Sequence, residues 1–557
     1  MTTARACLWV VLVWATIYLP ALGSLEIKGE EGRRILPAVA MLDTGRWIVP
    51  QVGGVPYLSK PPLINWLVAA AFRASGTRSE WAARAPSALA VLALAVTAVG
   101  SLSAFLSPAG ALLTAIFLLT NIGLMEKGRL AEIEALYLSL YGIALCSWLG
   151  AWRRDMATSA KPSWRTWAFP WIFLGFGLLT KGPLHLLFFY AVVVAILLCA
   201  GRARDLWNRW HLLGVVLMLG IFAAWAVPYL RQTAANGAGG VWLAQFQGRM
   251  EVNEAFRFQN WLLNIPRGLV NFLPWVVLLP LAWRRIPTTA SATADDKWNL
   301  AVLRGLRWGV GGCFLAVSLA PGGQPRYTLP LLVPASMLLG MCLAPALREK
   351  TSNVLPPLPG SLPLVWGRVL AACVGTAIVG ALAAVPIGES ALWERWGIAL
   401  VVFLAGWQIL ERRYRWSRLA DFPMLALASA VGMALLTADF AVSVVPRLRR
   451  GESVRPVGHR INRSVGRGET VAVLRPGFLP FLFYVHDLRY LQTPGELPPF
   501  VAYLLVREND LDPVAEVLRQ RQWTHRIALT VNDKRVKDPR LNTWLLLRLD
   551  PISETSL

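Results

Sequence analysis

Long apolar stretches recur along residues 1–443 of this 557-residue chain, with short polar segments between them. A stretch of roughly 18 or more apolar residues is long enough to cross a bilayer as a helix. The pattern predicts about 13 spans, near residues 6–23, 85–106, 108–125, 131–151, 167–180, 183–200, 211–229, 268–283, 304–320, 327–346, 368–387, 396–411 and 421–443. The first run lacks a convincing cleavage site, so we expect an uncleaved helix and not a signal peptide. The chain is therefore expected to be a polytopic α-helical membrane protein.

The composition agrees with this prediction. Hydrophobic residues make up 55% of the chain and charged residues 16%, and the mean hydropathy is +0.49. A soluble protein carries roughly a quarter charged residues. The six cysteines all fall within the predicted spans and show neither metal-ligand nor disulfide spacing, so we expect no chemistry from them.

Basic residues in the connecting loops set the expected orientation. Arg and Lys gather in every second loop, at 152–166, 201–210, 284–303, 347–367 and 412–420. The positive-inside rule places these loops and the N-terminus in the cytoplasm, and an odd number of spans places the C-terminal region outside. Orientation and contact with anionic lipid therefore explain much of the net charge of +23, and nucleic acid binding is not required.

Three longer segments are expected on the outer side, at 24–84, 230–267 and 446–557. The last contains strand-like stretches (470–474 and 501–506, then RIALTV and TWLLLRL) and a helix-like stretch, DPVAEVLRQRQ, with Asp512 as a plausible N-cap. We expect residues 1–445, with the first two outer loops, to form the membrane domain. Residues 446–557 are expected to form a small α/β domain in the periplasm.

Ionisable residues beside apolar spans are the functional candidates in a membrane protein. Glu30 and Glu31 follow the first span, Arg33 comes within a helical turn of them, and RRILPAVAML could form an amphipathic interfacial helix. Glu134 opens the fourth span. By the orientation above, five basic residues lie on the outer face, where topology does not require them: Lys60, Lys181, Arg249, Arg257 and Arg326. Solvated ion pairs and snorkelling side chains are the alternative to a binding site.

A polyprenyl-phosphate-linked sugar would suit a site with carboxylates, several cations and an apolar helix bundle. Its tail fits an apolar bundle, and cations would stabilise the phosphate that leaves. A carboxylate could take the proton from an attacking hydroxyl. The chain carries no phosphate-binding nucleotide motif, which is consistent with a donor that is not a nucleotide.

The segment GEEGRRILPAVAMLDTGRWIVPQVGGVPYLSKPPLINW and the elements TKGP, FLPW (272–275) and PRYTLPLL (325–332) keep their order and spacing over about the first 350 residues. They resemble the aminoarabinose transferase family, which is grouped with the protein O-mannosyltransferases among the GT-C glycosyltransferases. The resemblance implies a 13-span GT-C fold with an outer C-terminal domain. It implies transfer of a monosaccharide from a carrier such as undecaprenyl phosphate.

The resemblance also implies roles for single residues. Glu30 takes the place of the family's first-loop aspartate, the presumed base or metal-coordinating acid, with Glu31 beside it and Glu134 as a second acid. The positions that match donor-phosphate ligands are Lys60, Tyr57, Arg33, Arg249 and Lys181, with Arg129, Arg257 and Arg326 as additional candidates. The family's first-loop aspartate is Glu here, so the base is either Glu30 or Glu31. The second acid is also Glu, and Arg257 stands near the place of a family histidine, so the sugar and the acceptor stay open. No histidine cluster accompanies the acids, although carboxylates alone could hold a divalent ion.

The leading interpretation is an inverting membrane glycosyltransferase of the bacterial inner membrane, with its active site facing the periplasm. The acceptor is left open among a lipid A-like lipid, as in lipopolysaccharide modification, a glycan and a protein. The alternative is a transporter or flippase of a lipid-linked sugar, although the charges gather at one face and no internal repeat is present. A non-catalytic membrane scaffold is a third reading, which leaves the outer-face cations unexplained.

Overall fold

The computed structural model describes residues 1–158, 160–234, 240, 258–284, 294–343 and 430–551, apart from 431, 435, 467, 478 and 533–541. The chain divides into two compact units. The first contains residues 1–22, 59–64 and 84–446, and the second contains 23–58, 65–83 and 447–557. Most of the first outer segment, which the sequence analysis grouped with the spans, therefore packs with the C-terminal region.

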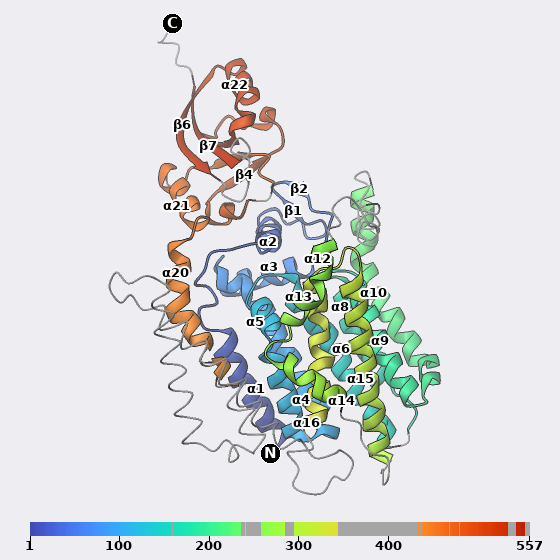
Figure 1. The fold of residues 1–557 in the computed structure, drawn as a ribbon. Coiled ribbons are helices and arrows are strands. Elements are labelled where there is room, and N and C mark those ends of the chain that lie inside the picture. The colour runs from blue at the N-terminus through green and yellow to red at the C-terminus, as the bar shows by residue number, and fades with distance from the viewer. Residues whose placement is uncertain are drawn as a thin grey trace, which may run out of the picture. The chain divides into compact units, whose positions relative to one another are not determined.

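The first unit is helical (Figure 1). Helix α1 (Thr3–Tyr18) follows an N-cap, Thr2, whose side chain accepts the Arg5 N–H. Helix α4 (Glu80–Leu119) covers the predicted span 85–106 and most of 108–125, whose last residues lie in α5 (Ile122–Gly128). The α4 backbone leaves helical geometry at Ser107 (φ 67°, ψ 157°), directly before Pro108, so two helices meet at a kink.

Most of the following predicted spans within the described ranges are single helices. They are α6 (Ile133–Ala157), α8 (Phe169–Leu178), α9 (Leu184–Cys199), α10 (Arg209–Thr233) and α15 (Ala294–Leu319). The span at 327–346 begins as a 3-10 helix, η4 (Pro325–Leu331), and continues as α16 (Leu332–Leu343).

The prediction of one span over 268–283 is wrong. This stretch is broken into α13 (Asn264–Val270), the 3-10 helix η3 (Trp275–Leu278) and α14 (Leu279–Arg284). Pro274 lies at the break, and a proline there cannot donate a helical hydrogen bond.

Among the described residues, five helices are long and apolar enough to cross a membrane. The predicted spans 368–387 and 396–411, and residues 421–429 of the last predicted span, lie outside the described residues. The total of about 13 spans therefore stays a prediction.

Helix α6 forms the centre of the first unit, because its residues from Ile133 to Arg153 are all buried. Its own buried side chains include Trp148 and Trp152, whose rings stack with centroids 5.7 Å apart. Glu134, in the first turn of α6, is therefore carried by a helix that is buried along almost its whole length.

The second unit contains a β-sheet (Figure 1). Its five strands lie in the order β4-β3-β5-β7-β6. The strands are β3 (Val471–Leu474), β4 (Leu488–Leu491), β5 (Tyr503–Arg507), β6 (Trp523–Asn532) and β7 (Thr543–Pro551). Strand β3 pairs in parallel with β4 and β5, whereas β7 pairs antiparallel with β5 and β6. The four stretches expected as strands overlap β3, β5, β6 and β7.

Helices cover both faces of this sheet. Val471 and Val473 of β3 pack in one apolar cluster with α21 (Arg455–Ser464), and Ala472 and Leu474 pack in another with α22 (Leu511–Gln520). Side chains alternate along a strand, so β3 is buried on both sides.

Asp512 is not an N-cap. A 3-10 turn over Glu508–Asp510 extends the helical backbone by one turn, and Asp510 occupies the cap position of α22 instead.

The first outer segment adds three elements to the structure. The stretch RRILPAVAML lies within α2 (Gly32–Thr44). A short hairpin, β1 (Gln51–Val52) and β2 (Val55–Pro56), turns through Gly53 and Gly54, both with positive φ. Helix α3 (Leu63–Ser75) follows.

Candidate functional site

Glu134 lies in the first turn of α6 and meets two cations. The Lys181 Nζ atom is 3.2 Å from Glu134 Oε1, and an Arg326 guanidinium nitrogen is 3.8 Å from the same oxygen. The Glu134 side chain is 4% exposed and that of Lys181 is 12% exposed. The structure thus brings together three residues that the sequence named as candidates.

Two tyrosines complete this group. The Lys181 Nζ atom lies 5.6 Å from the centre of the Tyr137 ring and 5.4 Å from that of Tyr327. Aromatic faces attract cations within about 6 Å. We call Glu134, Tyr137, Lys181, Arg326 and Tyr327 the Glu134 cluster.

The Glu134 cluster lines a small pocket whose other walls are apolar, formed by Leu184, Phe188, Leu329 and Pro330. One side of this pocket therefore offers charge and the other offers hydrocarbon contact. Arg326 is the most accessible member of the charged side, since its side chain is 41% exposed.

The turn that carries Lys181 is held by polar contacts. Gly182 adopts φ +111°, a conformation that favours glycine. The Tyr137 hydroxyl donates to the Gly182 carbonyl oxygen (3.1 Å) and accepts the His185 N–H (2.6 Å). Tyr137 therefore fixes the turn as well as facing the ammonium group.

Lys60 belongs to a short segment of the first unit, residues 59–64. The Leu63 N–H donates to the Leu179 carbonyl oxygen (3.0 Å), two residues before Lys181. Pro61 and Pro62 stiffen the intervening backbone. The segments that carry Lys60 and Lys181 are thus joined by a backbone hydrogen bond.

A second cluster surrounds the start of α2. Glu30 lies 3.1 Å from an Arg33 nitrogen and 3.6 Å from an Arg34 nitrogen. Arg34 also donates to the Tyr57 hydroxyl (3.2 Å). We call Glu30, Arg33, Arg34 and Tyr57 the Glu30 cluster.

The two neighbouring acids have different environments. The Glu30 side chain is 36% exposed, whereas Glu31 is fully buried. Glu31 accepts the Lys28 N–H (3.0 Å), so its carboxylate closes the turn before α2.

Arg34 follows Arg33 in the sequence but was not assigned a site role from it. Its side chain is 4% exposed, and its Nε atom is buried without a hydrogen-bond partner among the described residues. The spacing of four residues from Glu30 along an amphipathic helix was the available signal.

Arg129 lies outside both clusters. Its guanidinium group donates to the carbonyl oxygens of Ile17 (2.6 Å) and Pro20 and so satisfies carbonyls at the end of α1.

The neighbouring Lys127 lies near the end of α5 (Ile122–Gly128), 3.0 Å from Glu132 and 3.1 Å from Glu126. Burial acts to lower the pKa of Lys127, but Glu132 and then Glu126 raise it above its ordinary value. Lys127 and Glu132 were also missed, because nothing in their spacing sets them apart from a solvated helix end.

Arg249 and Arg257 lie outside the described residues. Within the described ranges, no group of three or more His, Cys, Asp or Glu side chains is arranged to hold a metal ion.

Comparison with known proteins agrees with the fold and the motifs. Residues 59–227 match the family model described as dolichyl-phosphate-mannose-protein mannosyltransferase. An undecaprenyl phosphate-alpha-4-amino-4-deoxy-L-arabinose arabinosyl transferase of Serratia proteamaculans is 25% identical, over 77% of this chain and 76% of that protein. A second protein of that name, from Pseudomonas fluorescens, is 23% identical over 94% of this chain and 92% of its own length.

Solved structures extend the similarity to nearly the whole chain. The crystal structure of ArnT from Cupriavidus metallidurans, bound to undecaprenyl phosphate, superposes with a TM-score of 0.63. The identity is 17%, and the match covers 98% of this chain and 97% of that one. The fold, the family model and the relatives are those of membrane glycosyltransferases. Within that class, the predicted resemblance to the aminoarabinose transferase and protein O-mannosyltransferase-like family is confirmed.

Proposed function

We propose that this protein moves a monosaccharide from a polyprenyl-phosphate carrier to a lipid acceptor on the outer face of the bacterial inner membrane. The relatives described above are named as transferases, which supports this function over a flippase. The observation that carries the proposal is the Glu134 cluster, where Lys181 and Arg326 meet at a pocket with apolar walls.

Lys181 and Arg326 would hold the donor phosphate. Both cations share the buried Glu134 carboxylate, and a phosphate offers more acceptor oxygens than one carboxylate does. The aromatic faces of Tyr137 and Tyr327 limit where the ammonium group can lie. Such preorganised cations stabilise the negative charge that develops as polyprenyl phosphate leaves. We assign Lys60 to the same phosphate because its segment is joined to the Lys181 turn.

Glu30 is the proposed base, and its exposure supports this assignment over Glu31. A base must reach the acceptor hydroxyl, and the partly exposed Glu30 is open to approach, whereas Glu31 is buried and already bonded. The acceptor oxygen forms a bond to the anomeric carbon while the bond from that carbon to the phosphate oxygen breaks. The hydroxyl proton passes to Glu30, and the sugar configuration inverts.

Glu134 is proposed as the second acid, which keeps the cations oriented before the donor binds. Arg33 and Arg34 pair with Glu30, and Tyr57 fixes Arg34. Arg249 is proposed as a further ligand of the donor phosphate, and Arg257 as an additional candidate. Both assignments rest on the family resemblance alone.

The function can be tested with purified protein in lipid vesicles that contain a polyprenyl-phosphate sugar and lipid A. We expect polyprenyl phosphate to be released with the wild-type protein and not with Glu30→Gln. The control Lys161→Met changes an exposed lysine outside both clusters and is expected to keep wild-type turnover. Movement of the intact donor between leaflets, without release of the carrier, would favour the flippase instead.

A further inference from the structure

Residues 28–31 form a turn that carries Glu30 and is closed by the Glu31 N–H, which donates to the Lys28 carbonyl oxygen. The chain that leads into this turn is held by residues from the far end of the sequence. Glu26 accepts the backbone N–H groups of Ser453 (3.1 Å), Val454 (2.8 Å) and Arg455 (2.8 Å), which follow it by 427 to 429 residues. Helix α21 begins at Arg455, and its N-cap, Val454, provides no side-chain hydrogen bond. Glu26 therefore supplies both the acceptor and the negative charge that a helix N-terminus favours.

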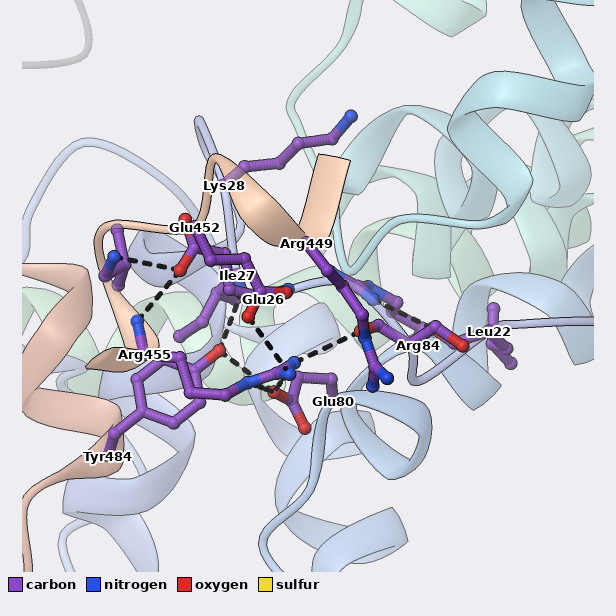
Figure 2. A network of polar contacts seen from close by, with 12 residues as sticks. Leu22, Glu26, Ile27, Lys28, Glu80, Arg84, Arg449, Glu452, Arg455 and Tyr484 are labelled. Carbon is purple, nitrogen blue, oxygen red and sulfur yellow. Dashed lines mark hydrogen bonds and ion pairs between the residues drawn. The ribbon is translucent and has the colours of Figure 1, made fainter. Parts of the chain in front are cut away.

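A second set of contacts converges on Glu80, as Figure 2 shows. The Arg455 guanidinium donates to Glu80 Oε1 through Nε (3.1 Å) and a terminal nitrogen (2.6 Å). The Tyr484 hydroxyl donates to the same oxygen (3.0 Å). Arg455 also pairs with Glu452 (3.3 Å), so its cation lies between two carboxylates.

These contacts reach the backbone directly before the turn (Figure 2). The Tyr484 hydroxyl accepts the Ile27 N–H (2.9 Å), and the Glu26 N–H donates to Glu452 (3.2 Å). The Lys28 N–H is then bonded to Glu31. Three consecutive N–H groups, at residues 26, 27 and 28, are thus fixed, and Glu30 follows two residues later.

The contacts are well sheltered from water. The exposed fractions are 18% for the Arg455 side chain, 14% for Glu80 and 9% for Glu452. Charge-assisted hydrogen bonds in such surroundings are stronger and more directional than exposed ones. Burial, and then the Glu80 carboxylate, raise the pKa of Tyr484 well above its ordinary value, so the hydroxyl keeps its proton and donates at all physiological pH values.

We infer that Glu26, Glu80, Arg455 and Tyr484 are positioning residues, through which the C-terminal region holds the turn that carries Glu30. The inference rests on the proposed role of Glu30 as the base. A base misplaced by about 1 Å can lose on the order of 100-fold in rate, so an anchor three or four residues before Glu30 affects turnover without touching the substrate. It also gives the C-terminal region a part in the reaction, although none of these four side chains takes part in the chemistry.

The test compares variants of the full-length protein in lipid nanodiscs. Tyr484→Phe removes one hydroxyl that both accepts from Ile27 and donates to Glu80. Arg455→Lys keeps the charge but loses the two-nitrogen contact with Glu80. Arg460→Ala alters an exposed side chain on the same helix, α21, and is the matched control.

Two readouts separate positioning from general stability. Hydrogen exchange in peptides that cover residues 24–31 is expected to rise roughly tenfold in Tyr484→Phe, while peptides of β5 and α22 keep the wild-type rate. Turnover is expected to fall on the order of tenfold in kcat, with the donor KM within about twofold of wild type. Arg455→Lys is expected to show the same pattern more weakly, and Arg460→Ala is expected to match wild type.

Two results would overturn the inference. One is unchanged exchange over residues 24–31 in both variants, which would mean that the contacts do not hold the turn. The other is faster exchange with wild-type kcat, which would reduce the contacts to a structural role. If the wild-type protein turned over no donor at all, the proposed function would fail, and the exchange result would still decide whether the contacts hold the turn.

Discussion

Replacing Lys181 by Met tests the pairing at the centre of the Glu134 cluster. Methionine retains a long apolar stem, so the packing against Tyr137 and Tyr327 is largely kept while the charge is lost. Glu134 then keeps Arg326, whose nitrogen is 3.8 Å away and whose side chain is 41% exposed. The substitution therefore isolates the electrostatic part of the Lys181–Glu134 contact.

The expected magnitude follows from burial. Removing one partner of a buried ion pair costs about 3–5 kcal/mol, because the other charge stays behind without compensation. Glu134 is 4% exposed, but Arg326 remains as a second cation, so we expect the lower end, about 3 kcal/mol. Glu134→Gln alone should cost about 2 kcal/mol, since it leaves two cations close together.

A double-mutant cycle measures the pair itself. Unfolding by a denaturing detergent can be followed by the fluorescence of the 26 tryptophans. We expect the Lys181→Met/Glu134→Gln double variant to cost about 3 kcal/mol, so that the coupling energy is about 2 kcal/mol. Additive effects within about 0.5 kcal/mol would refute the reasoning. Lys161→Met, at an exposed position, should cost under about 0.5 kcal/mol.

Three further outcomes are expected. Glu30→Gln should keep the fold and lower kcat by on the order of 100-fold or more, while wild-type turnover in this variant would move the base to another acid. Lys60→Ala should raise the donor KM roughly tenfold and leave thermal unfolding near that of wild type, and an unchanged KM would separate Lys60 from the phosphate. The N–H of Gln492, and then the Thr493 hydroxyl, lower the pKa of Glu496. The two hydrogen bonds therefore stabilise the turn above the ordinary carboxyl pKa, and this stabilisation is lost as the pH falls through the lowered pKa. Exchange of the Gln492 amide should therefore speed up, relative to its intrinsic rate, on acidification in wild type but not in Glu496→Gln, and equal pH dependence in both would contradict this.

The helices of the first unit could be predicted where apolar length alone decides. The prediction for 131–151 matches α6, and the one for 211–229 matches α10, because only a helix satisfies its own backbone in a bilayer. The prediction failed at 268–283, where hydropathy registers an apolar run but not the effect of Pro274 on the hydrogen bonds. The kink at Ser107 was anticipated only as a boundary between two spans.

The candidate site was predictable in its charges but not in its partners. Lys181 and Arg326 stood out because topology does not require basic residues on the outer face, and both lie against Glu134. The aromatic contribution of Tyr137 could not be inferred, because its contact with Lys181 joins residues on different elements. The pairing of Glu26 with the start of α21 is similarly hidden, since its partners are more than 400 residues away in the sequence.

The central claim is that this chain breaks the bond between a sugar and polyprenyl phosphate and joins the sugar to a lipid. The most direct measurement follows both products in one vesicle assay, with a donor labelled in the sugar and in the phosphate. We expect equal amounts of free polyprenyl phosphate and sugar-bearing lipid acceptor, with both products lost in Lys181→Met and Glu30→Gln. Carrier release without a matching gain of sugar in the acceptor, or equal turnover in the two variants and wild type, would contradict it.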